Sequence, residues 1–223
     1  MNELIDNFFN LEILRQTWPF LLAGVWVTIK ICFLVIPLGL AGGLALSLAS
    51  TSRYRAIRWL AVIYTDFFRA FPPLVLLLFV AFGLPFLGID PGAVGSVAIA
   101  FLLNTSSYYG EVFRAGIESV PNGQIEAARS TGLSKGQTMG HVVLPQAVRN
   151  VLPDLVGNTL EVIKLTSLAS VVALPELLFA ARSAQSVTYN ATPVIAAGLI
   201  YLVLLWPLVR WLSRLEHRQI ALN

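Results

Sequence analysis

Five apolar stretches constrain this chain more than any other feature of its sequence. Each is long enough to cross a bilayer as a helix, which takes about 20 residues, and they cover residues 20–49, 59–82, 93–113, 151–174 and 191–212. Charged residues make up only 12% of the chain, whereas a soluble domain has about 25%. The sequence therefore predicts an all-α membrane protein with about five transmembrane helices, whose two termini lie on opposite sides of the membrane.

Most basic residues lie on one side of these stretches. Ten follow the first, third or fifth stretch: Arg53, Arg55, Arg58, Arg114, Arg129, Lys135, Arg149, Arg210, Arg214 and Arg218. The opposite side holds only Arg15 and Arg182. Because positive charge is retained on the cytoplasmic side, we expect residues 1–19 to form an outer segment, residues 20–218 the membrane domain and residues 219–223 a cytoplasmic tail.

The loop at residues 114–150 is polar, predicted to be cytoplasmic and longer than most connections. Asn122 suits the cap of a first helix, and Gly132 suits the residue just past its end. Ser134 and Gln137 have the spacing of a capping box, which opens a second helix. The pattern predicts two short helices hinged at Gly132. A projecting hairpin favours a docking site for a soluble partner, although an amphipathic lid packed on the bundle fits the same spacing.

The same loop carries a motif at fixed spacing, and its residues are Glu126, Ala127, Ala128, Gly132, Leu144 and Pro145. This spacing resembles the EAA loop of ABC importer permeases, with Val142 where that family usually has Ile. Five blocks around it are similar to the polar amino acid permeases, which include histidine, glutamine, arginine and opine importers: LLAGVWVTIKI, YTDFFRAFPPLVLLLF, YYGEVFRAGIESVPNGQIEAA, LPQAVRNVLPDLVGN and IKLTSLASVVALPEL. They follow the family's order from about Phe20 to Arg218.

This resemblance implies a permease subunit of a type I importer in the bacterial cytoplasmic (inner) membrane. Its partners would be a cytoplasmic ABC ATPase dimer, a second permease subunit of the same or a homologous chain, an extracytoplasmic solute-binding protein and membrane lipid, but no nucleic acid. The six motif residues would dock on the ATPase. The chain itself would be no enzyme and hold no cofactor or metal. ATP and Mg would bind the partner ATPase, since no Walker A sequence GxxxxGK[ST] occurs here.

Ionisable residues within the predicted spans are candidate substrate contacts, because a charge at membrane depth is costly and tends to face a wet pathway. Asp66 with Arg69, and Glu161 with Lys164, are opposite charges at i, i+3 spacing, and Ser167 continues the second face. Such pairs suit the carboxylate and ammonium of a zwitterionic amino acid. Alternatively, each pair neutralises itself or bridges the second and fourth spans as a structural ion pair.

Other polar residues in the spans also have two interpretations. Lys30 either lines the pathway or extends its ammonium to the interface. The third span carries small polar side chains that either line the pathway or join helices: Asn104, Thr105, Ser106 and Tyr108.

The sequence departs from the family after Lys164, where many members carry an acid and this chain has Leu165. Glu161 lies about one helical turn earlier. Either the acid has moved and still holds an amine, or this subunit is the non-binding half of a heterodimer.

The leading function is therefore ATP-driven import of a polar amino acid or a related amine and carboxylate solute, opines included, coupled through the EAA loop to a separate ATPase. The alternative is an ATP-independent channel or facilitator for small polar solutes. An intramembrane enzyme is disfavoured, because both histidines, His141 and His217, fall in cytoplasmic segments.

Overall fold

The computed structural model describes the backbone of residues 6–220 and the side chains of residues 6–214. Within this part the chain is helical and contains no strand, which confirms the all-α prediction. The predicted tail at 219–223 lies largely outside the described residues, as do the first five residues of the outer segment and the side chains of His217 and Arg218.

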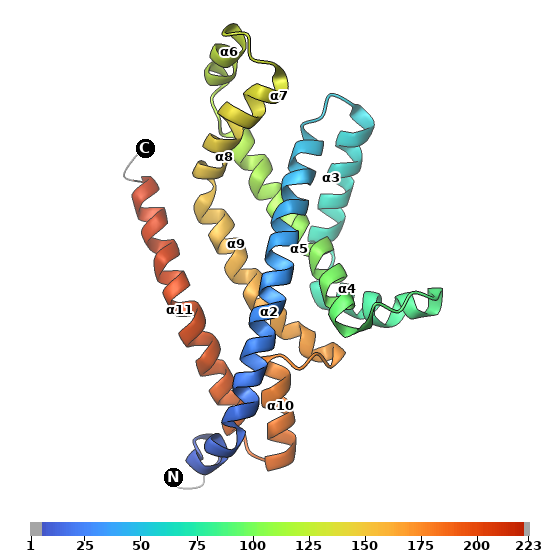
Figure 1. Ribbon diagram of the computed structural model, residues 1–223, viewed down its shortest axis with the longest axis vertical. Coiled ribbons are helices and arrows are strands. Elements are labelled where there is room, and N and C mark those ends of the chain that lie inside the picture. The colour runs from blue at the N-terminus through green and yellow to red at the C-terminus, as the bar shows by residue number, and fades with distance from the viewer. Residues whose placement is uncertain (1–5, 221–223) are drawn as a thin grey trace. The chain divides into compact units, whose positions relative to one another are not determined.

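The helices, shown in Figure 1, follow one another along the chain as α2 (Leu11–Ser50), α3 (Arg55–Ala70), α4 (Pro73–Leu78), the π-helical turn η1 (Phe79–Gly83), the 3-10 helix η2 (Leu84–Leu87), α5 (Gly92–Glu118), α6 (Asn122–Ser130), α7 (Lys135–Thr138), the π-helical turn η3 (Met139–Val143), α8 (Leu144–Asn150), α9 (Leu152–Leu165), the 3-10 helix η4 (Thr166–Val172), α10 (Leu177–Thr188) and α11 (Thr192–Ile220). They form two compact units. Unit 1 comprises residues up to Ile36, Pro73–Phe101 and Leu160–Arg210, and unit 2 comprises Pro37–Pro72, Leu102–Thr159 and the chain from Trp211 onward.

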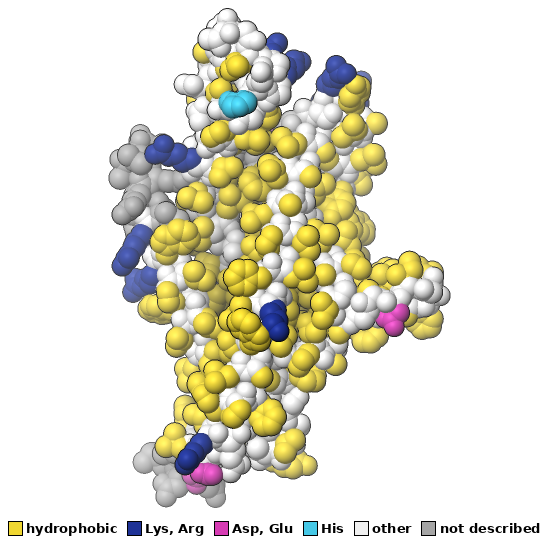
Figure 2. All heavy atoms as spheres, viewed as in Figure 1, with side chains coloured by type: hydrophobic (Ala, Val, Ile, Leu, Met, Phe, Trp, Pro, Cys, Tyr) yellow, Lys and Arg dark blue, Asp and Glu magenta, His cyan; other side chains and the backbone are white. Residues whose placement is uncertain are grey.

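Three helical segments among the described residues are long and apolar enough to cross a membrane: Asp6–Ser50, Leu152–Val172 and Thr192–Arg214. Hydrophobic side chains cover much of the visible surface of α2 and α11 in Figure 2, as lipid contact requires. Helix α5 has sufficient length, but the polar run at 104–109 lowers its mean hydropathy.

The second apolar stretch, expected as one helix over residues 59–82, is broken. Helices α3 and α4 meet at an angle of 102°, and the segment Arg55–Ala70 with Pro73–Leu87 is a fourth candidate span only if the bent pair is taken as one. The break follows from sequence, because a residue that precedes proline is driven out of the helical region. Phe71, which precedes Pro72, has φ −82° and ψ 127°.

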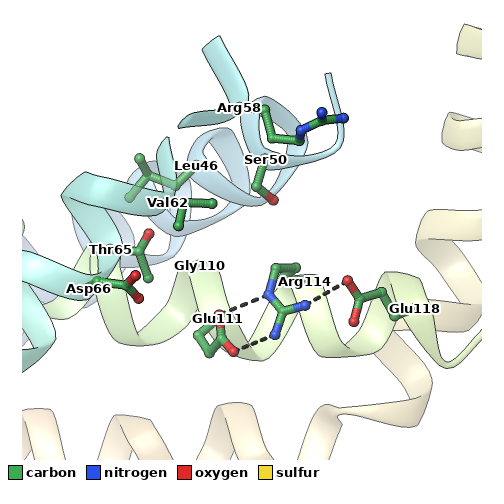
Figure 3. A pocket seen from close by; sticks show the side chains of 10 residues that line it. All are labelled: Leu46, Ser50, Arg58, Val62, Thr65, Asp66, Gly110, Glu111, Arg114 and Glu118. Carbon is green, nitrogen blue, oxygen red and sulfur yellow. Dashed lines mark hydrogen bonds and ion pairs between the residues drawn. The ribbon is translucent and has the colours of Figure 1, made fainter. Parts of the chain in front are cut away.

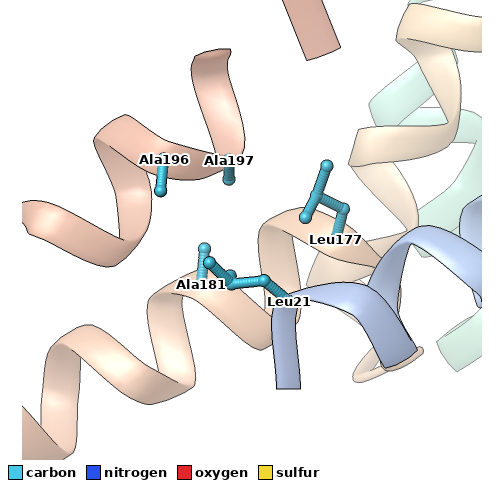
Figure 4. Close-up of a cluster of buried hydrophobic side chains, with 5 residues drawn as sticks. All are labelled: Leu21, Leu177, Ala181, Ala196 and Ala197. Atoms are coloured by element: carbon cyan, nitrogen blue, oxygen red, sulfur yellow. The ribbon is translucent and has the colours of Figure 1, made fainter. Parts of the chain in front are cut away.

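Unit 1 is held together where α10 packs on the first part of α2 and on the start of α11. Figure 4 shows the buried cluster between these helices: Leu21, Leu177, Ala181, Ala196 and Ala197. The Leu177 amide donates to the Thr28 hydroxyl at 3.2 Å. The sequence did not predict α10, since residues 175–190 have no long apolar run.

The cap of α10 is a fully buried carboxylate, Glu176. Its two oxygens accept hydrogen bonds from the amides of Phe179 at 2.8 Å and Leu178 at 2.9 Å, and the Tyr201 hydroxyl donates to it at 2.9 Å. Burial raises the pKa of Glu176, and these hydrogen bonds act in the opposite direction. The cap therefore ties α10 to α11 through a polar contact inside the core.

Unit 2 is built on close contact between the second part of α2 and α5. A Cβ atom placed on Gly43 would lie 2.5 Å from the Tyr109 Cβ and 2.7 Å from the Gly110 amide nitrogen, so only glycine allows this approach. Polar side chains of α5 then reach α3: Asn104 donates to the Phe68 carbonyl at 3.3 Å and Ser106 shares a hydrogen bond with Tyr64 at 2.9 Å.

We predict that Gly43→Ala lowers the free energy of unfolding by about 1–3 kcal/mol, because the added methyl group overpacks a contact made partly of backbone. The measurement is the thermal unfolding midpoint of the purified protein in detergent. Gly198→Ala on α11 is the matched control, since a Cβ atom placed on Gly198 would have no neighbour within 4 Å and the midpoint should stay or rise. Equal midpoints for the two variants would contradict this account of α2–α5 packing.

Candidate functional site

The polar loop of unit 2 folds into the predicted helical hairpin, formed by α6, α7 and η3 (Figure 1). The capping box is confirmed: the Ser134 hydroxyl accepts from the Gln137 amide at 3.3 Å, and the Gln137 side chain accepts from the Ser134 amide at 2.9 Å. Gly132 has φ 89°, a left-handed conformation that favours glycine. The cap predicted at Asn122 is wrong, because the preceding residue is Pro121 and α6 starts at Asn122 without a side-chain cap.

Helix α6 carries the first three residues of the sequence motif. Glu126 and Ala127 are exposed, whereas Ala128 is only 8% exposed. Of the two alanines, Ala127 alone is therefore available to a partner as the structure stands, and Ala128 packs inward. Because the Ala127 side chain is short and the Glu126 carboxylate beside it is exposed, another protein can approach the α6 backbone closely and meet a polar surface there.

The inner surface of the hairpin rests on a small apolar core. Four buried residues from α5, the α5–α6 link, η3 and α8 form it: Ile117, Val120, Val143 and Ala147. Ile125 of α6 and Leu144 of α8 pack against this core, and Pro145 lies exposed in the first turn of α8. The hairpin is thus joined by packed side chains to α5 and α8.

A second feature of unit 2 is a polar cavity of about 330 Å³, shown in Figure 3. Residues of α2, α3 and α5 line it: Leu46, Ser50, Arg58, Val62, Thr65, Asp66, Gly110, Glu111, Arg114 and Glu118. Arg114 donates to Glu111 at 2.9 Å and to Glu118 at 2.6 Å. The hydrogen bond to Glu111 contributes most to raising the pKa of the Arg114 guanidinium, so this side chain stays charged.

Asp66 and Arg69 do not form the predicted pair. Among the described residues, the ion pair of Arg69 is with Glu111, at 3.8 Å, and its guanidinium lies 5.7 Å from the centre of the Tyr108 ring. The bridge thus joins the second apolar stretch to the third, not to the fourth. Glu111 of α5 thus lies within ion-pair distance of both Arg69 and Arg114.

Glu161 and Lys164 do contact each other. The Lys164 ammonium donates to the Glu161 carboxylate, and both side chains are more than half exposed, at 51% and 68% for Lys164 and Glu161. The hydroxyl of Ser167 donates to the Lys164 carbonyl at 2.8 Å. The structure therefore brings the predicted pair together on one exposed face of α9, with Ser167 held to the backbone.

The remaining polar candidates from the sequence are Lys30 and the polar run of α5. Lys30 is exposed, with its ammonium 5.5 Å from the centre of the Trp26 ring. Asn104, Ser106 and Tyr108 each hydrogen-bond to α3, which matches the helix-packing interpretation. Among the described residues, no three His, Cys, Asp or Glu side chains are arranged to hold a metal ion.

A family model described as "Binding-protein-dependent transport system inner membrane component" matches residues 39–220. The chain belongs to this family. The match includes the hairpin, the cavity and the Glu161–Lys164 face, and the family resemblance expected from the sequence is confirmed.

Relatives of this permease cover nearly the whole chain. The Bacillus subtilis (strain 168) protein named "Probable amino-acid ABC transporter permease protein YckA" is 39% identical over 197 residues, which are 88% of this chain and 87% of that protein. The "Arginine transport system permease protein ArtQ" of the same organism is 35% identical, over 92% of this chain and 94% of that protein. A solved structure described as "Crystal structure of an amino acid ABC transporter with histidines" has a TM-score of 0.84 and 34% identity, covering 92% of this chain and 96% of that chain.

The charge network of the permease around Glu111, Arg114 and Glu118 was not predicted from the sequence. A usable signal was present, because the i, i+3 and i, i+4 spacing places these side chains on one helix face. It was overlooked because Glu111 falls inside the predicted third span and Arg114 just beyond its end. Arg69, on another helix, could not be added from spacing alone.

We predict that Gly132→Ala destabilises the hairpin of the permease by about 1–2 kcal/mol, because a Cβ disfavours the left-handed backbone. The methyl group meets no atom within 4 Å, so the effect is purely conformational. Hydrogen exchange of the amides in α6 and α7 should accelerate. Gly136→Ala, equally free of contacts but outside the left-handed region, should leave exchange unchanged or slow it; similar exchange in both variants would show that the hinge does not depend on the Gly132 backbone.

Proposed function

We propose that this permease serves an ATP-driven importer that carries a polar amino acid, or a related solute with amine and carboxylate groups such as an opine, into the cytoplasm. The observation that carries the proposal is the helical hairpin, whose exposed Glu126 and Ala127 offer a docking surface and whose inner side is packed into the bundle. The names of the relatives support amino acids as the solute class.

The membrane arrangement that we propose has five crossings, with the bent pair α3–α4 and the polar helix α5 as the second and third. The N-terminus lies outside, and the C-terminus and the hairpin lie in the cytoplasm. The distribution of basic residues supports this orientation. The Asn10 amide donates to the Thr192 hydroxyl at 2.9 Å, so α2 and α11 begin next to each other. This contact supports an arrangement in which both helices start on the same side of the membrane.

Coupling in this proposal is mechanical. A cytoplasmic ABC ATPase dimer, which binds ATP and Mg, holds α6 of each permease subunit through Glu126, Ala127 and the Gly132 turn. Closure of the ATPases moves the hairpin, and the apolar core at Ile117 and Ala147 passes this movement to α5 and α8 as a rigid contact. Close packing favours such transmission, since a packed core shifts as a body and does not deform continuously.

The solute contact that we propose is the Glu161–Lys164 face, with Ser167 beside it. Its two charges satisfy one another, but an exposed ion pair in water is worth only about 0–1 kcal/mol. A zwitterion in a wet pathway can therefore exchange with it at little cost, placing its ammonium at Glu161 and its carboxylate at Lys164. Arg69 and Lys30 stay secondary candidates, because Arg69 is engaged by Glu111 and Lys30 by Trp26. Asp66, which lines the cavity of unit 2 and forms no ion pair among residues 6–214, is a secondary candidate as well.

Reconstitution tests this function. Proteoliposomes should contain the permease with its genomically adjacent ATPase, solute-binding protein and any second permease, and uptake of labelled arginine, histidine, glutamine, glutamate and an opine should be followed with and without internal ATP. We expect one solute class to accumulate only with ATP. Uptake that does not depend on ATP would show that the protein works as a facilitator and not as part of an ATP-driven importer.

In the same vesicles, Glu126→Arg should reduce ATP-driven uptake by about tenfold or more, because reversed charge opposes docking at a surface that carries the coupling. The exposed side chain makes normal insertion and folding the expectation. Asn122→Arg, which also alters an exposed position on α6, is the control and should transport normally. Unchanged uptake by Glu126→Arg would remove this residue from the coupling surface.

For the solute contact, we predict that Glu161→Gln raises the apparent KM for an amine-bearing solute by about tenfold, since a charged hydrogen bond worth about 1.5–3 kcal/mol becomes a neutral one. The binding protein presents the solute, so uptake should be measured at saturating and limiting binding-protein concentrations. Ser167→Ala is the milder comparison. An unchanged KM and maximal rate would identify Glu161–Lys164 as a structural pair.

A further inference from the structure

The turn between α10 and α11 is locked to the N-terminal segment by hydrogen bonds within unit 1. The Asn190 side chain donates to the Asp6 carbonyl at 2.7 Å and accepts from the Thr192 amide at 2.9 Å, and the Ala191 amide donates to the Asn7 carbonyl at 3.0 Å. Asn190 is only 9% exposed. Figure 1 shows this place where the end of α10, the start of α11 and the first helical residues meet. These hydrogen bonds join the turn at residues 189–192 to residues 6–8, and the two segments together form one platform.

Tyr189 stands on this platform in an unfavourable backbone conformation. It follows α10 with φ 50° and ψ 34°, the left-handed region where glycine is usual just past a helix end. A bulky residue there costs on the order of 1 kcal/mol. Its side chain is 91% exposed, so packing within the chain does not offset that cost. Fold stability thus gives no reason for a tyrosine here, whereas contact with another molecule does.

A polar hollow of about 640 Å³ lies beside Tyr189, lined by both parts of the platform. Its side chains include Asn7, Phe8, Arg182, Gln185, Ser186 and Tyr189. Arg182 is exposed, and no ion pair among residues 6–214 involves it. The hollow therefore combines one cation without an ion pair, three neutral polar side chains besides the engaged Asn190, and two aromatic rings. Tyrosine and arginine are among the residues that most often dominate binding at protein interfaces.

We propose that this hollow docks the extracytoplasmic solute-binding protein through an acidic, hydrogen-bonding patch on that protein. The inference rests on the proposed function, which supplies the partner and the outward orientation. Arg182 is one of only two basic residues on the predicted outer side, where positive charge is otherwise avoided. Its unpaired charge attracts a carboxylate, and the exposed Tyr189 ring offers a large contact area while only two side-chain torsions have to be ordered.

A lipid surface fits the hollow less well. Recognition of anionic headgroups depends on clusters of about four to eight basic residues, and the hollow contains only Arg182. Headgroups are also mobile and gain nothing from a fixed geometry, whereas the hydrogen bonds of Asn190 and Ala191 fix the backbone next to Tyr189. A preformed polar hollow with a strained aromatic residue at its edge suits a folded protein partner.

The test measures binding of the adjacent-gene solute-binding protein to the full permease–ATPase complex in lipid nanodiscs, together with ATPase activity with and without that protein. Arg182→Glu should raise the Kd by about tenfold or more and weaken the stimulated ATPase activity, while basal activity stays unchanged. Tyr189→Asn, which suits the left-handed backbone and so preserves the turn, should also raise the Kd by about tenfold. Arg15→Glu, another exposed outer arginine that does not line the hollow, should change it less than twofold.

Charge reversal of one acidic residue at a time on the binding protein should include a variant that restores affinity for Arg182→Glu. If both Arg182→Glu and Tyr189→Asn bind normally, while the binding protein binds and stimulates the wild-type complex, the proposed docking surface is wrong and the proposed importer function stands. A loss confined to nanodiscs with phosphatidylglycerol, and absent with phosphatidylcholine only, would assign the hollow to lipid and overturn it as well. A wild-type complex that neither binds nor responds to the binding protein would overturn the proposed importer function, and the docking surface with it.

Discussion

Every backbone N–H and C=O group inside a bilayer needs a partner within the protein, because hydrocarbon supplies none. This constraint makes the apolar stretches of the chain helical, and all later features are built on helices that cannot be rearranged locally without exposing polar backbone. Where the chain does leave the helix between α3 and α4, Phe71 keeps a hydrogen bond from its amide to the Phe67 carbonyl at 3.0 Å. The bend therefore changes the direction of the chain without orphaning that amide.

Helices in lipid gain little from apolar surface alone, so small residues and polar contacts decide how they associate. Gly43 gives α2 access to the backbone of α5, and the side chains of Asn104 and Ser106 then reach α3. In unit 1 the buried Glu176 performs a comparable task for α10. Most of these polar side chains thus hold helices together, so few of them are available to contact a solute.

Sequence reasoning succeeded for most features that a local rule determines, although the cap expected at Asn122 was wrong. The hydrophobic lengths located the long helices, and the Ser134–Gln137 spacing and Gly132 located the hairpin, because capping and left-handed turns depend on residues only a few positions apart. It failed for α10, whose cap is a glutamate and whose apolar face becomes visible only against Leu21 and Ala197. It also failed for Arg69, because the choice between Asp66 and Glu111 as partner depends on the angle between two helices.

The pairing of Arg69 with Glu111 decides which ionisable side chain of the second apolar stretch has no ion pair among residues 6–214. Arg114 is matched by Glu111 and Glu118, and Arg69 approaches Glu111, so the cations next to these acids are engaged. Asp66 faces the same cavity but forms no ion pair within residues 6–214. An ionised carboxylate that is neither paired nor hydrated is strongly unfavourable at membrane depth. Asp66 is exposed and lines the cavity of about 330 Å³, so water in that cavity can reach its carboxylate. Of the two ionisable groups Asp66 and Arg69, it is therefore Asp66 that has no ion pair among residues 6–214.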